Sequence, residues 1–231
     1  MRVLVIGCHP DDETLGAGGT VIRHVNQGDD VSVCILTDGV GARHQRKEQQ
    51  KECAEKACAI LGVHDVVFCD LPDQGLDAMP LLDVIRPIEQ RVNKFVPNIV
   101  YTHFAGDVNQ DHRAAFQATT VACRSVASSP VERLLCYETA SSTEWAPPFP
   151  GSSFTPNVYV DIEDELDQKI EAMTAYAHTH VSEVKPYPHP RSYEAVAVHA
   201  RSRGVAAGMK AAEAFALVRE RVVKRGGTPW A

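Results

Sequence analysis

The sequence predicts an α/β protein with a doubly wound, mostly parallel β-sheet. Five runs rich in β-branched and aromatic residues, at 2–7, 31–38, 65–70, 98–103 and 133–138, alternate with amphipathic segments of helical length. Such alternation is typical of a parallel sheet with helices on both faces. The 231 residues and 44% hydrophobic content suffice for one core and are few for two, so we expect a single domain over residues 1–231.

Four helices are expected between and after the first four runs, at 18–27, 46–61, 79–95 and 113–126. Gly28 and Gly62 follow the first two segments, where glycine commonly ends a helix.

Beyond residue 138 the pattern changes. Residues 139–157 are rich in Pro, Ser and Thr and also carry aromatic side chains, which predicts an ordered active-site loop. Residues 158–231 are expected to extend the same domain, with a strand at 158–162 and two helices near 164–177 and 191–222.

The composition favours a small-molecule substrate. Thirty acidic and 23 basic residues give a formal net charge of −7, which disfavours nucleic acid and anionic membranes as partners.

The seven cysteines include no C-x-x-C pair and lie in apolar surroundings, so we expect them to be reduced. Because no secretory signal or membrane-spanning run is visible either, the prediction is a cytoplasmic protein.

Charged side chains gather directly after the first predicted strand, in the stretch GCHPDDETLGAGG at 7–19. In open parallel sheets, ligands bind beyond the carboxyl ends of the strands, where the strand order reverses. His9 beside Asp11, Asp12 and Glu13 concentrates the residue types that bind metals. A charged turn that only solvates the loop is the alternative, and we favour a functional site.

A second cluster, THFAGDVNQDHRAAF at 102–116, follows the fourth predicted strand. If the strand order is 3-2-1-4-5, the first and fourth strands are neighbours and the two clusters face each other. Two histidines and one carboxylate then converge, for example His9, Asp12 and His112, as in a catalytic zinc site with open positions. Asp11 remains to act as a base. The same ligands suit Fe(II), but nothing here indicates redox chemistry, so zinc is preferred.

The motifs H-P-D-D-E, L-G-A-G-G-T and D-H-R-A resemble those of the PIG-L or LmbE-like metal-dependent N-deacetylases. The resemblance runs from Val3 to about Ala118 in order and spacing. It implies a Rossmann-like fold and removal of an acyl group, usually acetyl, from the nitrogen of an amino sugar or related conjugate. It also implies that His9, Asp12 and His112 bind zinc and that Asp11 is the general base. Assembly into a homo-oligomer is compatible with the resemblance.

One position departs from the family pattern. Many members carry a second histidine three residues before the last ligand, thought to polarise the amide carbonyl, and this chain has Asn109 there. His189 lies between prolines in PYPHPRS (186–192), which hold its backbone away from helix, so we expect it to replace the missing histidine. The alternative is a rigid turn into the last helix, with Ser192 as its N-cap.

Three further residues are candidates for substrate binding. Asp73 stands where relatives use an acidic residue to hold a sugar hydroxyl; otherwise it is a turn aspartate. Arg191 is placed to hold a substrate carboxylate or phosphate. Arg46, with its basic neighbours, is a candidate for the phosphate of an activated sugar, although a solvated helix start is the commoner fate of such residues.

These observations predict a zinc-dependent hydrolase that removes an N-acetyl group from an acetamido sugar, free or nucleotide-linked. The segments PHPRSYEA and ARSRGVAAGMKAAEAF resemble a bacterial branch of the family associated with surface-polysaccharide and modified-sugar pathways. An amidase of a sugar–thiol conjugate and a non-catalytic sugar-binding protein remain as alternatives. Asp11 argues against the second, because metal binding alone would not need that additional carboxylate.

Overall fold

The computed structural model describes residues 1–39, 47–149, 152–177 and 182–222. Within them lies one seven-stranded sheet of order β3-β2-β1-β4-β5-β7-β6. The pairs among β1 to β5 are parallel, and β7 is antiparallel to both β5 and β6. The predicted order 3-2-1-4-5 is therefore confirmed. The strands are β1 (Arg2–Gly7), β2 (Asp30–Thr37), β3 (Asp65–Leu71), β4 (Ile99–Thr102), β5 (Arg133–Tyr137), β6 (Val158–Asp161) and β7 (Ala212–Glu220).

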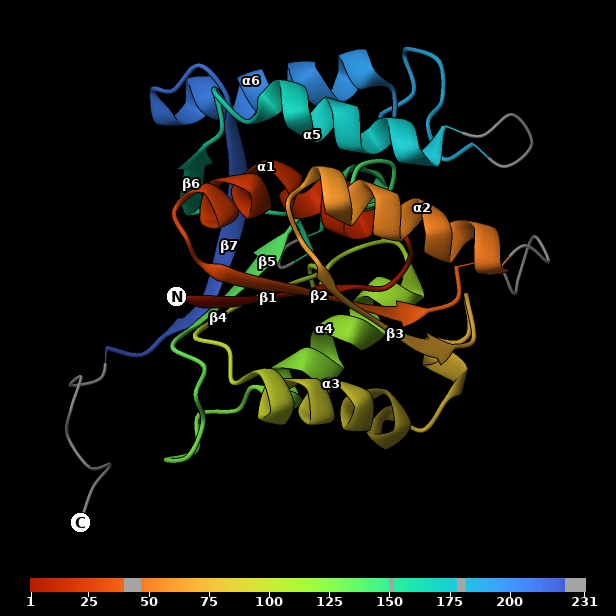
Figure 1. Cartoon of the computed structure of the whole chain (residues 1–231), viewed down its shortest axis with the longest axis vertical. Coiled ribbons are helices and arrows are strands. Elements are labelled where there is room, and N and C mark those ends of the chain that lie inside the picture. The colour runs from red at the N-terminus through yellow and green to blue at the C-terminus, as the bar shows by residue number, and fades with distance from the viewer. Residues whose placement is uncertain (40–46, 150–151, 178–181, 223–231) are drawn as a thin grey trace.

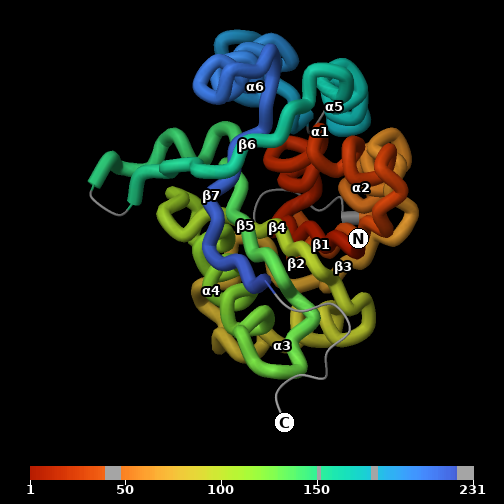
Figure 2. Tube along the Cα trace, turned by 90° about the vertical axis from the view of Figure 1, so that its left-hand side faces the viewer, coloured from red at the N-terminus to blue at the C-terminus, as the bar shows by residue number. Residues whose placement is uncertain are grey.

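Helices form a layer on each side of the sheet (Figure 1). On one side lie α1 (Asp12–Asn26) and α2 (Lys47–Ile60), with α5 (Leu166–Met173) and α6 (Tyr193–Ala207) farther from the central strands. The other contains α3 (Leu81–Phe95) and α4 (Gln110–Ala122). The view in Figure 2 shows α5 and α6 at one end of the molecule and α3 at the other.

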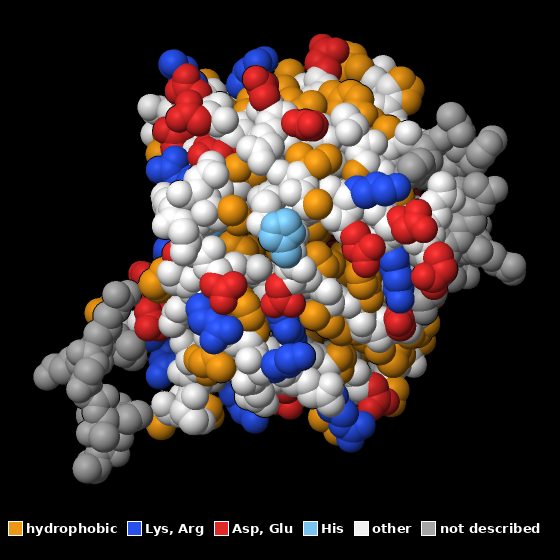
Figure 3. All heavy atoms as spheres, in the orientation of Figure 1, with side chains coloured by type: hydrophobic (Ala, Val, Ile, Leu, Met, Phe, Trp, Pro, Cys, Tyr) orange, Lys and Arg blue, Asp and Glu red, His pale blue; other side chains and the backbone are white. Residues whose placement is uncertain are grey.

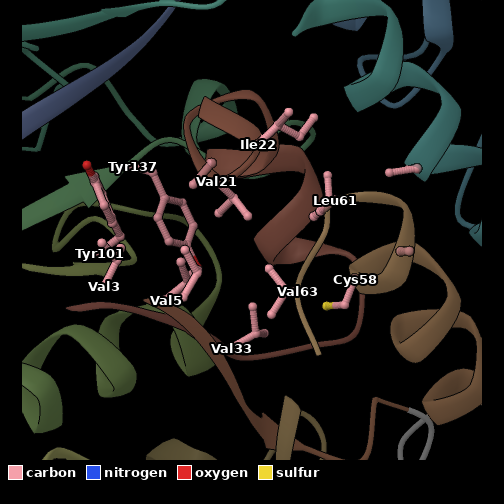
Figure 4. Packing of buried hydrophobic residues seen from close by; sticks show 14 of the residues in the cluster. Val3, Val5, Val21, Ile22, Val33, Cys58, Leu61, Val63, Tyr101 and Tyr137 are labelled. Atoms are coloured by element: carbon pink, nitrogen blue, oxygen red, sulfur yellow. The ribbon is translucent and has the colours of Figure 1, made fainter. Parts of the chain in front are cut away.

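The central strands are buried on both faces. Val3 and Val5 of β1 join the core beneath α1 and α2, part of which is shown in Figure 4. Leu4 and Ile6 join the core against α3 and α4. Because successive side chains of a strand point to opposite faces, a strand covered on both sides is apolar throughout, as this one is.

Helix α1 begins at Asp12, six residues before the predicted start at residue 18. Gly16, Gly18 and Gly19 lie inside the helix, where the lack of a side chain allows close packing. A Cβ at Gly16 would lie 2.6 Å from Tyr137 Cε2, and one at Gly19 would lie 2.9 Å from Ile162 Cδ1. The early start places Asp12 in the first helical turn, directly beyond β1.

The helix predicted over 191–222 is wrong in its second half. Helix α6 ends at Ala207, Gly208 follows with a φ of 73°, and Ala212–Glu220 form β7. Alanine and glutamate favour helix locally, but β7 fills the space between β5 and β6 and pairs with both. Tertiary context therefore overrides local propensity. The other two expectations are confirmed, since β6 occupies 158–161 and α5 continues into a 3₁₀ turn, Thr174–Tyr176.

Acidic and basic side chains are interspersed over the face drawn in Figure 3. This mixture differs from the clustered lysines and arginines that bind phosphate backbones. Among the helices that the structure describes, none has the length and apolar character needed to cross a membrane.

We predict that Gly16→Ala lowers the free energy of unfolding by about 1–3 kcal/mol, the usual cost of forcing extra volume into a packed core. Tyr137 cannot easily move away, because it is fully buried and its hydroxyl donates a hydrogen bond to the Ile6 carbonyl at 2.7 Å. Gly18→Ala is the matched control, since its Cβ would lie 3.3 Å from Lys169 Cγ, a contact that needs a shift of only a few tenths of an ångström. Urea unfolding of both variants measures the difference, and equal stabilities would contradict this packing.

Candidate metal centre

The two charged clusters meet at the carboxyl ends of β1 and β4, as predicted. These strands are hydrogen-bonded neighbours, with Val3 opposite Ile99 and Val5 opposite Tyr101. His9 and Asp12 follow β1, whereas His112 lies in the first turn of α4, after β4. Residues about 100 positions apart in the sequence thus come into contact because two parallel strands end side by side.

The three predicted ligands form a compact triangle. His9 Nδ1 lies 3.3 Å from Asp12 Oδ2, His112 Nε2 lies 3.3 Å from His9 Nδ1, and His112 Nε2 lies 3.5 Å from Asp12 Oδ2. Ligands bound tetrahedrally at zinc–ligand distances of about 2.0–2.2 Å are themselves about 3.3–3.6 Å apart. Asp12 Oδ1 is buried and has no hydrogen-bond partner among the described residues. The donor atoms, their spacing and this unpaired oxygen fit a zinc ion.

The other ring nitrogen of His112 faces a carboxylate. His112 Nδ1 lies 3.2 Å from Asp107 Oδ2, which also accepts a hydrogen bond from the Thr143 hydroxyl at 2.7 Å. The Ser142 hydroxyl donates to Asp107 Oδ1. Although burial opposes ionisation, the hydrogen bond and charge of His112 lower the pKa of Asp107 to about 2. Asp107 thus accepts a hydrogen bond from Nδ1, which leaves the Nε2 lone pair of His112 available to a metal ion.

His9 is oriented in the same way by Asp111. His9 Nε2 lies 3.2 Å from Asp111 Oδ2, and the backbone N–H groups of Gln74 and Leu76 donate to the Asp111 carboxylate at 2.8 and 3.0 Å. This arrangement leaves Nδ1 of His9 toward Asp12 and His112. Neither Asp107 nor Asp111 was predicted from the sequence. The sequence does show one aspartate directly before His112 and another five residues before it. The direction in which these two carboxylates point, however, depends on loops that are distant in sequence.

His103, at the end of the fourth predicted strand, was also missed. Its Nε2 accepts the N–H of Cys8 at 2.9 Å, and its ring stacks on His112 with centroids 3.9 Å apart. Burial and the nearby His112 lower the pKa of His103 to about 4, so the ring is neutral at pH 7. Donor atoms of Cys8, Asp12, His103 and His112 all lie within 4.8 Å of one another. Because Cys8 N–H already uses the Nε2 lone pair of His103, the triangle with His9 is the better site.

Asp11 stands beside the triangle in an unusual backbone conformation. Its φ of 114° lies where side chains other than glycine are rare, and such strain clusters at functional sites. The backbone N–H of Asp11 donates to Glu13 Oε2 at 3.1 Å, and Arg191 Nη1 donates to Asp11 Oδ2 at 2.8 Å. Burial raises the pKa of Asp11 well above its ordinary value, while Arg191 opposes that effect.

A cavity of about 720 Å³ opens over these groups. It brings the predicted site residues His9, Asp11, Asp73, Asn109, His189 and Arg191 together with Ser141, Ser142 and Trp145 of the predicted loop. Asp12 and His112 join them through their contacts with His9. Arg46 lies outside the described residues.

The polar groups around this cavity have defined partners. Asp73 Oδ1 lies 3.3 Å from His9 Nε2. Asn109 is the N-cap of α4, with Oδ1 accepting the Asp111 N–H at 2.9 Å. His189 Nδ1 accepts the backbone N–H of Arg191 at 3.1 Å, and Ser192 caps α6 as the turn reading of this segment expected. Burial, Arg191 and Lys185 lower the pKa of His189, which favours its neutral form.

Comparison with known proteins identifies the family. The family model PIG-L, described as GlcNAc-PI de-N-acetylase, matches residues 4–123. The protein named uncharacterized deacetylase YaiS of Escherichia coli K12 is 30% identical over 168 residues, which cover 71% of this chain and 83% of the relative. The 1D-myo-inositol 2-acetamido-2-deoxy-alpha-D-glucopyranoside deacetylase of Actinosynnema mirum is 31% identical over 177 residues, covering 62% of this chain and 60% of the relative.

Among solved structures, the conserved protein TT1542 of Thermus thermophilus superposes with a TM-score of 0.76 and 26% identity. The match covers 97% of this chain and 98% of TT1542, so the similarity includes β6, β7 and α6 beyond the region of the family model. The motifs, the sheet order and the sequence matches agree. The chain belongs to the PIG-L family of deacetylases.

Proposed function

We propose that the protein is a zinc-dependent N-deacetylase of an acetamido sugar. The observation that carries this proposal is the triangle of His9, Asp12 and His112 donor atoms beside the Asp11 carboxylate. The family description and the name of the Actinosynnema relative, which both specify N-acetylated glucosamine, support the choice of substrate. Fe(II) is the alternative metal for the same ligands.

The proposed reaction breaks the C–N bond of the acetamide and yields acetate and a free amine. His9, Asp12 and His112 would hold the zinc ion, which would supply Lewis-acid chemistry by lowering the pKa of water and polarising the acetamide carbonyl. Asp11 accepts the proton of the attacking water and returns it to the leaving amine. The presence of Asp11 argues against the alternative of a sugar-binding protein that has lost turnover.

His189 and Asn109 are the proposed donors to the oxygen that gains negative charge. Because His189 Nδ1 accepts the Arg191 N–H, the neutral ring carries its proton on Nε2 and donates from there. Asn109 uses Oδ1 to cap α4, so Nδ2 is the donor that it offers. A fixed donor needs no reorganisation when charge develops, which is the advantage of both groups.

We propose Asp73 as the acceptor for a sugar hydroxyl, since its carboxylate borders the same cavity as His9 and Asp11. Arg46 is proposed to meet a phosphate if the sugar is nucleotide-linked. Surface-polysaccharide precursors are the proposed source of such substrates, because the C-terminal motifs resemble that bacterial branch.

A direct test is to measure acetate release by the zinc-loaded protein from N-acetylglucosamine, N,N'-diacetylchitobiose and a nucleotide-linked N-acetylglucosamine. We expect zinc-dependent turnover of at least one. Binding of these sugars without acetate release would favour the sugar-binding alternative. Turnover of a sugar–thiol amide with none of the three would favour the amidase.

We predict that His112→Ala weakens zinc binding by more than about 100-fold, since even the groups that orient metal ligands contribute about 10–100-fold. Elemental analysis after dialysis measures the bound zinc. Cys8→Ala is the matched control and should keep its zinc, because Cys8 belongs only to the alternative cluster with His103. Loss of zinc from Cys8→Ala and not from His9→Ala would overturn the assignment.

Asp11→Asn should retain zinc and lower kcat by roughly 10²- to 10⁴-fold, the usual contribution of a general base. The substitution removes a negative charge and keeps the size of the side chain. Steady-state acetate release and zinc content should be measured on the same preparation. Turnover near that of the wild type with full zinc would exclude Asp11 from this role.

His189→Ala should lower kcat/KM by roughly 10²- to 10³-fold, as expected for the loss of an oxyanion donor. His189→Gln, which restores an N–H donor, should recover part of this loss. Retention of kcat/KM within a few-fold in the alanine variant would reduce His189 to a turn residue. Zinc content and thermal unfolding serve as controls for the fold.

A further inference from the structure

Arg191 lies on a segment whose backbone is fixed by local hydrogen bonds. The His189 N–H donates to the Pro186 carbonyl at 3.1 Å, and the Ser192 N–H donates to the His189 carbonyl at 2.9 Å. The Ser192 hydroxyl then caps α6 by accepting the Ala195 N–H at 3.1 Å. The Cα of Arg191 therefore has a defined position directly before a helix.

The guanidinium of Arg191 joins three segments that are distant in sequence. Nη1 donates to Asp11 Oδ2 at 2.8 Å and to Glu183 Oε2 at 2.7 Å, and Nε donates to Ser141 Oγ at 2.7 Å. The Arg191 side chain is 21% exposed and that of Asp11 only 4%. Ion pairs in such partly dehydrated surroundings are stronger and more directional than surface pairs.

Hydrogen bonds to Asp11 restrict the orientation of its carboxylate. The N–H of Asp11 is bound by Glu13, and its Oδ2 is bound by Arg191. With one oxygen held, the carboxylate has a restricted rotation and Oδ1 is left as the second acceptor. Arg191 is engaged by two protein carboxylates, so its charge is already balanced without a substrate anion.

We propose that Arg191 is a positioning residue that holds Asp11 for proton transfer, a role that rests on the proposed deacetylase function. The substrate-binding role expected for Arg191 from the sequence stays a prediction. The two roles differ in their kinetics, because a positioning residue acts on kcat whereas an anion-binding residue acts mainly on KM.

Arg191→Gln tests the proposal, with Arg191→Lys as the conservative variant. We expect Arg191→Gln to lower kcat by at least about 30-fold with KM within about 3-fold and zinc content unchanged, and Arg191→Lys to recover part of the loss. Arg203→Gln is the matched control, since Arg203 also pairs with a carboxylate, Glu138, but away from Asp11. It should keep the wild-type kcat. An unchanged kcat with a large rise in KM for Arg191→Gln would overturn the proposal.

A double-mutant cycle adds a readout that does not depend on turnover. If Arg191 acts through Asp11, the shifts in Tm caused by Asp11→Asn and Arg191→Gln are not additive. Kinetically, Arg191→Gln should add little to the loss already caused by Asp11→Asn. Additive effects on both Tm and kcat would refute the proposal. If the wild type releases no acetate at all, the deacetylase function fails, while the Tm cycle still decides whether Arg191 holds Asp11.

Discussion

The carboxylate of Asp12 is the group on which the arrangement of the site depends. Its Oδ2 lies 3.3 Å from His9 Nδ1, 3.2 Å from His103 Nε2 and 3.5 Å from His112 Nε2, and it accepts the His9 N–H at 2.7 Å. Burial alone would raise the pKa of Asp12, but the neighbouring His112 lowers it well below its ordinary value. A buried carboxylate of this kind is stable only with hydrogen-bond donors or positive charge around it.

The topology of the sheet brings such partners to Asp12. Asp12 begins α1 at the end of β1, and His103 and His112 arrive after the neighbouring strand β4. Asp107 and Asp111 then fix the direction of the His112 and His9 imidazoles. Removing one partner of a buried charged pair typically costs about 3–5 kcal/mol, several times the contribution of a surface pair. The buried interactions of the site therefore contribute to the stability of the fold.

Those features of fold and site that are encoded locally could be predicted from the sequence. The five parallel strands are apolar runs, and His9, Asp12 and His112 are ligand types placed where two such runs end. Strand β7 was missed because Ala212–Glu220 favour helix by composition and become a strand only beside β5 and β6. The start of α1 at Asp12 was missed because Gly16, Gly18 and Gly19 are weak helix formers, whereas the structure uses Gly16 and Gly19 for close packing inside the helix.

Contacts between distant loops could not be predicted. Arg191 and Asp11 are 180 positions apart, and the groups that hold Asp107 and Asp111 come from segments near residues 142 and 75. Their residue types are common in turns, so the sequence carried no distinguishing signal for them.

The proposed chemistry requires a metal ion on His9, Asp12 and His112. Anomalous diffraction at the zinc absorption edge, from crystals of the zinc-loaded protein, locates that ion directly. We expect one strong peak about 2.0–2.2 Å from His9 Nδ1, His112 Nε2 and an Asp12 carboxylate oxygen. A peak bound instead by Cys8 and His103, or no peak near Asp12, would show that the ligand set is wrong.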